Sequence, residues 1–367
     1  MSSAFHPCQQ YTDVRDCGLA PKNDQASRSR LSRSISLREL GKHLGLSPTT
    51  VSLVLNGSPA AASIPKETQA RIFAAAKSFD YHPNFFARSL RSQRTYLVGV
   101  VVPEVSEGYA SLVLSGIEEA LLAQEYVYLV TSHRHKPDLI ERGPRLLYER
   151  CVEGVIAVDT PLRGELPVPV VLISGHERMA GTTNIVLDHE AAAELGLRHL
   201  IALGHRKIAF FKGQAFSSDA EVRFDAIART AAKLGIEVRE RLVAPLEGVS
   251  PSPETGYCAA RQLLSTGEEF TALWAFNDIS AIGAVRALIE AGKRVPGDVS
   301  VLGFDDVLSA AFHNPALTTL RQPLIRMGKV AAETLLRRIR NAGEELPAEI
   351  SLEPELVVRE STAAAVF

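Results

Sequence analysis

Apolar side chains recur at helical spacing in three short runs between residues 37 and 79. The first run stops at Gly45, which suits a left-handed helix end, and the second opens with Ser47, a good N-cap, followed by Pro48 at the first helical position. The tight turn between them predicts a helix-turn-helix, and a third run after Pro65 can close a three-helix core. The apolar positions are Leu37, Leu40 and Leu44, then Val51, Val54 and Leu55, then Ile72, Phe73, Ala76 and Phe79.

From Thr95 the pattern changes to a continuous apolar run at 96–102, which is typical of a parallel strand buried on both faces. Strand-like and helix-like segments then alternate, and a second series of the same kind starts near residue 188. This alternation predicts an α/β body of two doubly wound parallel-sheet lobes. The expected helices are 109–124, 137–150, 189–203, 219–234, 254–266, 279–291 and 324–341, and the expected strands are 127–131, 154–158, 168–173, 207–211, 271–276, 299–304 and two near 349 and 356.

With 367 residues the chain can form a small head and a large body, and its charge divides between them. Residues 1–95 carry 13 Lys and Arg against 6 Asp and Glu, a net charge of +7, whereas the remainder carries −9. A basic head on an acidic body suits a protein whose head alone meets phosphates.

The four cysteines are scattered, without a C-x-x-C pair or a zinc-type Cys/His spacing, so we expect reduced thiols, no metal and no cofactor. Residues 1–34 are polar, lack a signal-peptide core and are expected to be disordered. No later run is long enough for a membrane span, and the protein is expected in the cytoplasm. The cysteines are Cys8, Cys17, Cys151 and Cys258.

Two motifs lie in a specific order in the head. Residues 50–57 read T-V-S-L-V-L-N-G, and residues 81–90 read Y-H-P-N-F-F-A-R-S-L. The pair resembles the DNA-binding head of the LacI/GalR family of transcriptional regulators. Further matches carry the resemblance over all but about the first 35 residues: Gly116-Ile117-Glu118, the stretch 199–207, Asn277-Asp278 and Gly303-Phe304-Asp305-Asp306.

The resemblance implies a homodimeric repressor that binds near-palindromic operator DNA and is controlled by a small effector, expected to be a sugar, in the cleft of a periplasmic-binding-protein-like body. Ligand binding would change lobe orientation and act on the DNA through a hinge helix. The expected parts are a helix-turn-helix domain at 35–82, a hinge at 83–94, a body at 95–360 and a tail at 361–367. Within the body, lobe 1 is expected at about 95–187 and 318–348, and lobe 2 at about 188–317 and 349–360.

The second helix of the head is the expected reader of the major groove. Thr49 can bond a base or a phosphate, Leu53 can pack on a thymine methyl, and Pro48 offers shape. A core position for Leu53 is the alternative. The expected phosphate contacts are Ser47, Thr50, Ser52 and Asn56. In the hinge, the resemblance implies that Leu90 inserts into the minor groove. Asn84, Ala87 and Arg91 are expected to contact DNA beside it. The alternative is that this segment is a solvated linker, in which Leu90 has no special role.

Ligands of two-lobed α/β bodies bind at the carboxyl ends of the strands, and polar or aromatic residues follow several predicted strands. Arg223, Asn277 and Asp305 match effector-binding positions of the family. Trp274 lies within a strand, so packing and pocket roles are equally open. The full set of expected effector residues is Tyr109, Ser174, Arg223, Trp274, Asn277 and Asp305.

Two departures leave the effector's identity open. Ser174 stands where several sugar-responsive members have an acidic residue, and residues 107–110 lack one ring of the family's aromatic pair. A purine-like or nucleoside-like effector is therefore the alternative to a sugar. His133-Arg134-His135 is interpreted as a polar loop rather than a metal site.

Two other classes of protein compete with a regulator. A periplasmic solute receptor is opposed by the head and by the missing export signal. The alternative of an α/β enzyme with a DNA-binding head lacks a catalytic motif in the sequence. The body shows no nucleotide-binding glycine loop, nucleophile elbow or zinc-protease helix.

Overall fold

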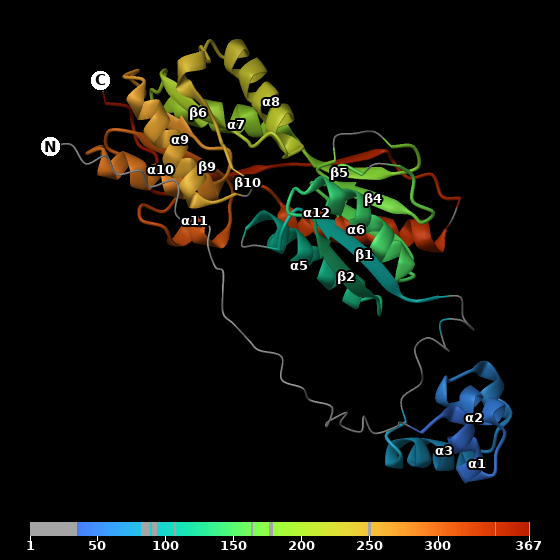
Figure 1. Ribbon diagram of the computed structural model, residues 1–367. Coiled ribbons are helices and arrows are strands. Elements are labelled where there is room, and N and C mark those ends of the chain that lie inside the picture. The colour runs from blue at the N-terminus through green and yellow to red at the C-terminus, as the bar shows by residue number, and fades with distance from the viewer. Residues whose placement is uncertain are drawn as a thin grey trace, which may run out of the picture. The chain divides into compact units, whose positions relative to one another are not determined.

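The computed structural model describes residues 35–81, 89, 94–105, 108–162, 164–175, 179–248, 251–341 and 343–366. The chain divides into two compact units, Met1–Ser92 and Gln93–Phe367. The first unit contains the head and the second contains the body (Figure 1).

The head is a three-helix unit whose turns match their capping residues. Ser36 forms a capping box with Glu39 at the start of the first helix, and Gly45 ends that helix with φ 68°. The Ser47 hydroxyl then accepts a hydrogen bond from the Thr50 amide at 3.1 Å, so the second helix starts as expected. The elements are α1 (Leu37–Leu44), α2 (Pro48–Leu55), the 3-10 helix η1 (Pro59–Ser63) and α3 (Lys66–Ser78).

The core of the head differs from the predicted one at two aromatic positions. Phe73 and Phe79 were expected inside, but their side chains are 52% and 39% exposed. Ala75 takes the inward position on α3, and Phe79 makes an edge contact with the His43 ring. A small core has little room for large rings, so alanine lines the crossing. The buried core residues are Leu40, Val51, Val54, Ala61, Ile72, Ala75 and Ala76.

The body contains two six-stranded sheets, each covered by helices on both faces. The strand orders are β11-β5-β4-β3-β1-β2 and β12-β10-β9-β8-β6-β7, and among the described strands only the β10–β12 pair is antiparallel. The first sheet comprises β1 (Leu97–Val102), β2 (Val127–Ser132), β3 (Gly154–Val158), β4 (Val170–Ile173), β5 (Thr183–Leu187) and β11 (Glu349–Leu352). The second comprises β6 (Ile208–Lys212), β7 (Val243–Pro245), β8 (Ala272–Trp274), β9 (Ser300–Asp305), β10 (Thr318–Arg321) and β12 (Glu355–Val357).

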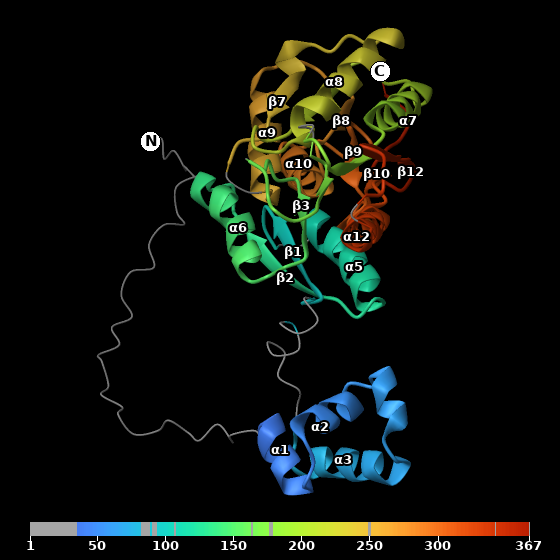
Figure 2. The ribbon, with the colours of Figure 1, turned by 90° about the vertical axis from the view of Figure 1, so that its right-hand side faces the viewer.

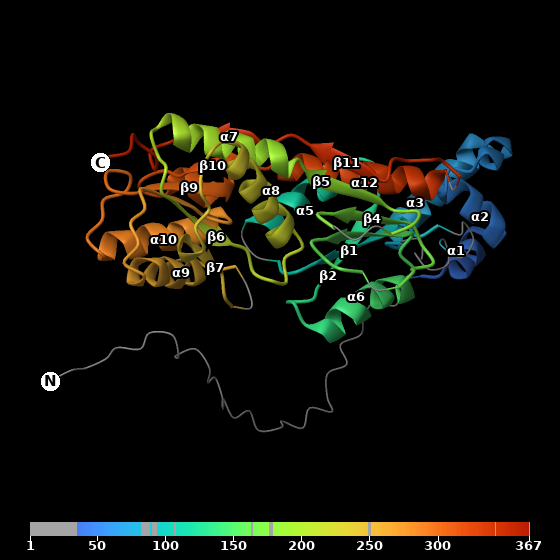
Figure 3. The same cartoon turned by 90° about the horizontal axis from the view of Figure 1, so that it is seen from above.

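Helix pairs bury the faces of these sheets, as predicted from the continuous apolar strands. Figure 2 shows α6 on one side of the first sheet and α5 and α12 on the other. Figure 3 shows α7 and α8 across the second sheet from α9 and α10. The bounds are α5 (Tyr109–Leu122), α6 (Pro137–Glu149), α7 (His189–Ala202), α8 (Asp219–Lys233), η2 (Glu240–Leu242), α9 (Pro253–Ser265), α10 (Asp278–Glu290), α11 (Leu308–Phe312) and α12 (Leu324–Arg340).

The chain crosses between the lobes at places that differ slightly from the expected boundaries. β10, expected in lobe 1, pairs with β9 in the sheet of lobe 2. β11, expected in lobe 2, pairs with β5 in the sheet of lobe 1. The crossings therefore lie after β5, between β10 and α12, and between β11 and β12, and they join the lobes into one unit.

The α9–α10 crossing depends on glycine. A Cβ at Gly283 would lie 1.8 Å from the Pro253 carbonyl oxygen, and one at Gly256 would lie 2.0 Å from the Ser280 carbonyl oxygen. Gly283→Ala should therefore destabilise the body by about 1–3 kcal/mol, because the helices must separate. Urea unfolding measures the change. Ile289→Ala is the control, since that side chain of α10 is 52% exposed, and equal midpoints for the two variants would contradict the close contact.

Candidate functional site

The outer end of α2 is the first candidate site. Ser47, Pro48 and Thr49 are exposed at its N-terminal turn, and Thr50 is half-buried. The hydroxyls of Ser47 and Thr50 share a hydrogen bond at 2.8 Å, so one of their two protons remains free to be donated to a partner. Ser47, Pro48 and Thr49 are therefore the side chains at this turn that are exposed to a partner.

The second half of α2 faces inward more than the sequence suggested. Ser52, expected to point outward, is only 7% exposed and accepts a hydrogen bond from the Asn56 amide at 3.0 Å. Leu53 is half-buried and packs against the core of the head. Both α1 and α3 contact α2, so this short helix is covered on two sides. The expected hinge contacts Asn84, Ala87, Leu90 and Arg91 lie outside the described residues.

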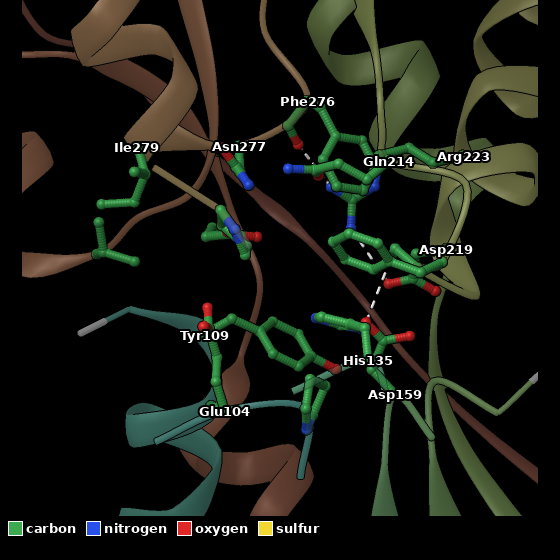
Figure 4. Close-up of a pocket in the computed structure, with 17 residues that line it drawn as sticks. Glu104, Tyr109, His135, Asp159, Gln214, Asp219, Arg223, Phe276, Asn277 and Ile279 are labelled. Atoms are coloured by element: carbon green, nitrogen blue, oxygen red, sulfur yellow. Dashed lines mark hydrogen bonds and ion pairs between the residues drawn. The ribbon is translucent and has the colours of Figure 1, made fainter. Parts of the chain in front are cut away.

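A cavity of about 90 Å³ lies at the carboxyl ends of the strands of both lobes and is the second candidate site. Figure 4 shows Glu104 and Tyr109 on one side and Gln214, Arg223 and Asn277 on the other. The structure brings four of the expected effector residues to its wall: Tyr109, Arg223, Asn277 and Asp305.

Tyr109 begins α5 and presents a hydroxyl that remains protonated. Its oxygen lies 2.9 Å from the hydroxyl of Ser174, which is 1% exposed and supports the tyrosine from behind. Burial raises the pKa of Tyr109 well above its usual value, and the carboxylates of Asp219 and Asp159 raise it further. Ser174 thus lies next to the cavity rather than in its wall, where it sets the orientation of the Tyr109 ring.

Arg223, on α8, is only 4% exposed, and several contacts fix the position of its guanidinium. Its guanidinium donates to the Phe276 carbonyl oxygen at 2.6 Å and to the Asp219 carboxylate at 3.2 Å. It also lies over the rings of Phe276 and Phe304, 4.4 and 3.8 Å from their centroids. Within the described part of the chain its Nε finds no hydrogen-bond partner, which leaves one donor for a ligand.

Asp305 ends β9 in a backbone conformation that costs energy. Its φ is 109°, a region that residues other than glycine rarely adopt. One carboxylate oxygen accepts a hydrogen bond from Gln322 Nε2 at 2.6 Å. Burial raises the pKa of Asp305 to about 6, although Arg223 and Gln322 favour the ionised form. This carboxyl group therefore changes its protonation state slightly below neutral pH.

A second buried acid, Asp278, holds the wall behind Asp305. It accepts hydrogen bonds from the Thr319 hydroxyl at 2.7 Å and from the Val307 amide at 2.9 Å. Burial and the charge of Asp305 raise its pKa to about 8. Asp278 therefore links α10 to β10 and to the loop after β9, which is a structural role.

Asn277 and Trp274 occupy different surroundings although they lie only three positions apart in the sequence. Asn277 lines the cavity while its side-chain oxygen caps α10 by accepting the Ser280 amide at 2.9 Å. Trp274 is 1% exposed and belongs to the hydrophobic core beneath α7, where a Cβ on Gly196 would lie 2.3 Å from its ring. The structure gives Trp274 a packing position and does not place it at the cavity wall.

Several wall residues were not anticipated from the sequence. Asp159 follows β3 and crosses to the other lobe, accepting the Ser218 amide at 2.8 Å and the Ser218 hydroxyl at 2.6 Å. His135, interpreted as part of a polar loop, stacks on Phe216 with 3.5 Å between ring centroids. Gln214 also lines the cavity. The strand-end rule applied to β2, β3 and β6 could have found them.

Metal ligation was the other chemistry to consider for these side chains. In the described ranges, no group of three or more His, Cys, Asp or Glu side chains is placed to hold a metal ion. His133 is buried and its Nε2 lies 3.1 Å from the Thr160 hydroxyl. Burial lowers the pKa of His133 to about 4 and also lowers that of His135, so both rings are neutral at pH 7.

Comparison with known proteins shows that the head and the body, which carry the two candidate sites, occur together in one family of proteins. The family model described as bacterial regulatory proteins, lacI family, matches residues 36–84, and that of the periplasmic binding protein-like domain matches residues 197–362. The HTH-type transcriptional repressor PurR of Haemophilus influenzae is 30% identical over 337 residues, which cover 89% of this chain and 98% of the relative. The chain belongs to the LacI family.

Solved structures agree with this membership. The LacI-family chain is similar to the lac repressor dimer bound to operator and the anti-inducer ONPF, with a TM-score of 0.81, 26% identity and coverage of 90% and 100% of the two chains. It is also similar to the transcriptional regulator CelR in complex with cellobiose, with a TM-score of 0.65, 28% identity and coverage of 89% and 99%.

This LacI-family protein is a DNA-binding transcriptional regulator with an effector-binding body, as the resemblance of its sequence implied. Its α1 and α2 form the helix-turn-helix, and its two sheets form the lobes. Across the described residues, no helix is long and apolar enough to cross a membrane.

Proposed function

We propose that this LacI-family protein is a repressor that binds near-palindromic operator DNA as a homodimer and responds to a small polar ligand in the cavity between its lobes. The observation that carries the proposal is the cavity itself. Its wall combines Tyr109 and Asp159 from the first lobe with Arg223, Asn277 and Asp305 from the second. A ligand that contacts both lobes can stabilise one lobe orientation over another.

In this proposal the N-terminal turn of α2 contacts the major groove of the DNA. Pro48 and Thr49 are exposed there, and the hydroxyls of Ser47 and Thr50 lie beside them. We assign base contacts to Thr49 and backbone contacts to the hydroxyls and to Asn56. The burial of Ser52 and the half-burial of Leu53 reduce their share. One head buries little surface, so two heads on a dimer supply the affinity.

A sugar is the proposed effector, because the wall offers carboxylates, amides and a guanidinium for hydroxyl groups together with apolar ring faces. The similarity to CelR in complex with cellobiose supports this class. A purine-type ligand is the second candidate, favoured by the similarity to PurR repressors and by the rings of Tyr109, Phe216 and Phe276 at the cavity. A repressor acts on DNA, so we expect it in the cytoplasm.

The test uses the full chain with random duplex DNA. Selection and sequencing should return two inverted half-sites. Sugars and purine bases are then screened for a change in operator affinity of about fivefold or more, which is the lower end of ordinary allosteric coupling. Failure to enrich any sequence, or ligand binding that leaves operator affinity unchanged, would reject the proposal. Chromatography of the ligand after incubation tests the enzyme alternative, which predicts turnover.

Leu90→Ala tests the proposed hinge contact, which the resemblance assigns to a residue outside the described ranges. Loss of a side chain that wedges between base pairs should weaken operator binding by more than about 1 kcal/mol, without changing the melting temperature of the body. Fluorescence anisotropy and DNA-bending assays measure the effect. Leu122→Ala is the control, since that leucine is 56% exposed on α5. Equal operator affinity and bending for both variants would remove Leu90 from the interface.

A further inference from the structure

The charge of the cavity wall is strongly one-sided. The described residues that line it include four carboxylates, Glu104, Asp159, Asp219 and Asp305, but a single arginine and no lysine. His135 does not offset this charge at pH 7, because burial lowers the pKa of its ring below the usual value. A ligand that only offers hydroxyl groups would leave this excess of negative charge in place.

Arg223 is already engaged with one of these acids. Its guanidinium lies 3.2 Å from Asp219, and the other Asp219 oxygen lies 3.3 Å from His189 Nε2. The same guanidinium donates to a backbone carbonyl and lies over two rings. Its charge is thus largely offset by the wall before any ligand arrives.

Asp305 is a wall acid without an ion pair among the described residues, as are Glu104 and Asp159. It is 7% exposed, and the charge of Arg223, which pairs with Asp219 at 3.2 Å, favours the ionised form of Asp305 without forming an ion pair with it. A buried carboxylate without a countercharge is costly, and the raised pKa is the expected response. The protein also accepts a strained φ of 109° at this residue. The cost of the buried carboxylate favours a ligand that compensates its charge.

Two donors on the same wall need acceptors. Gln214 is 2% exposed, and its Nε2, like Nε of Arg223, has no hydrogen-bond partner within the described residues. Buried donors without partners are unfavourable, so the ligand must also present oxygen or nitrogen lone pairs. The rings of Tyr109 and Phe276 add apolar faces for a flat or saturated ring.

We infer that the effector is an amino sugar, a polyhydroxylated ring whose protonated amine pairs with the Asp305 carboxylate while its oxygens accept hydrogen bonds from Gln214 and Arg223. This inference rests on the proposed function, since it names the ligand of the same cavity. It excludes neutral sugars and neutral purine bases as preferred ligands.

The pairing has a defined pH dependence. The charged or titratable groups around Asp305 are Arg223 and Asp219 from α8, Tyr109 from α5 and Asp278 from α10. Burial raises the pKa of Tyr109 well above its usual value, so this hydroxyl stays protonated between pH 5 and 7. Asp305, with a pKa of about 6, takes up a proton in this interval. The affinity for a cationic ligand should therefore fall by about tenfold from pH 7 to pH 5.

Matched pairs of compounds provide the test: glucosamine with glucose, galactosamine with galactose, and mannosamine with mannose. Thermal shift and calorimetry on the full chain should show at least tenfold tighter binding of one amine than of its neutral counterpart. Asp305→Asn should abolish that preference and its pH dependence, and asparagine tolerates a positive φ, so the fold is kept. Asp225→Asn, an exposed acid on the same lobe, is the control.

The outcomes separate this inference from the proposed function. Equal or tighter binding of neutral sugars or of hypoxanthine, or no binding of any amine, overturns the inference; a neutral ligand that shifts operator affinity would leave the regulator intact. An amine that binds through Asp305 without changing operator affinity supports the inferred ligand chemistry of the cavity and rejects the proposed regulation.

Discussion

Replacing Val51 by aspartate should abolish operator binding while leaving the body folded and able to bind its ligand. Val51 is fully buried where α2 packs against α1 and α3. A charged carboxylate at this point costs several kcal/mol, and a head of fewer than 60 residues has little stability to offset that cost. Circular dichroism and limited proteolysis report the unfolding of the head, and fluorescence anisotropy reports the loss of DNA binding.

The same variant measures how independent the two units are. Residues Met1–Ser92 and Gln93–Phe367 form separate compact units, so the melting temperature of the body should stay within one or two degrees of the parent. Val358→Asp introduces the same charge at a valine that is 60% exposed in the body, and it should leave operator binding unchanged. Operator binding retained by Val51→Asp, or a destabilised body, would contradict this division.

The elements of the fold were predictable wherever a local signal was strong. Ser47 and Pro48 fixed the start of α2, and the apolar run at 96–102 gave β1 within one residue. β5 and β7 were missed for different reasons. β5 begins with the polar residues Thr183 and Asn184, which pair within the sheet, and β7 has only three residues. Neither leaves a periodic pattern long enough to recognise.

The cavity was predictable to the extent that it depends on topology. Parallel strands end at one edge of a sheet, so Tyr109, Asn277 and Asp305 could be placed there from their position after a strand. Trp274 could not, because its contact with Gly196 joins residues far apart in the chain. The contact of Asp159 with Ser218 likewise depends on how the two lobes meet.

The head shows the limit of reading one helix by itself. The stripe of Val51, Val54 and Leu55 left Ser52 on the outer side, but contacts with both α1 and α3 cover two sides of α2 and bury this serine. An eight-residue helix has only two turns, so a second packed side leaves little surface for a partner. The exposed N-terminal turn with Pro48 and Thr49 is what remains for DNA.

Arg223→Ala should abolish the ligand response and destabilise the body by about 3–5 kcal/mol. The guanidinium is 4% exposed and bridges the Asp219 carboxylate and the Phe276 carbonyl. Its removal leaves a buried carboxylate without its arginine, the most costly way to break such a pair. It also removes the Nε donor offered to a ligand. Urea unfolding measures the stability, and operator-affinity titrations with ligand measure the response.

Two further variants separate recognition from folding. Arg229→Ala removes an arginine from the same helix whose side chain is 57% exposed, and it should change neither stability nor response appreciably. Adding Asp219→Ala to Arg223→Ala removes the carboxylate left behind and should restore at least about 1 kcal/mol of stability, but not the ligand response. If the double variant regained the response, Arg223 would act only by supporting the fold, and ligand recognition would belong to the other wall residues, such as Gln214, Asn277 and Asp305.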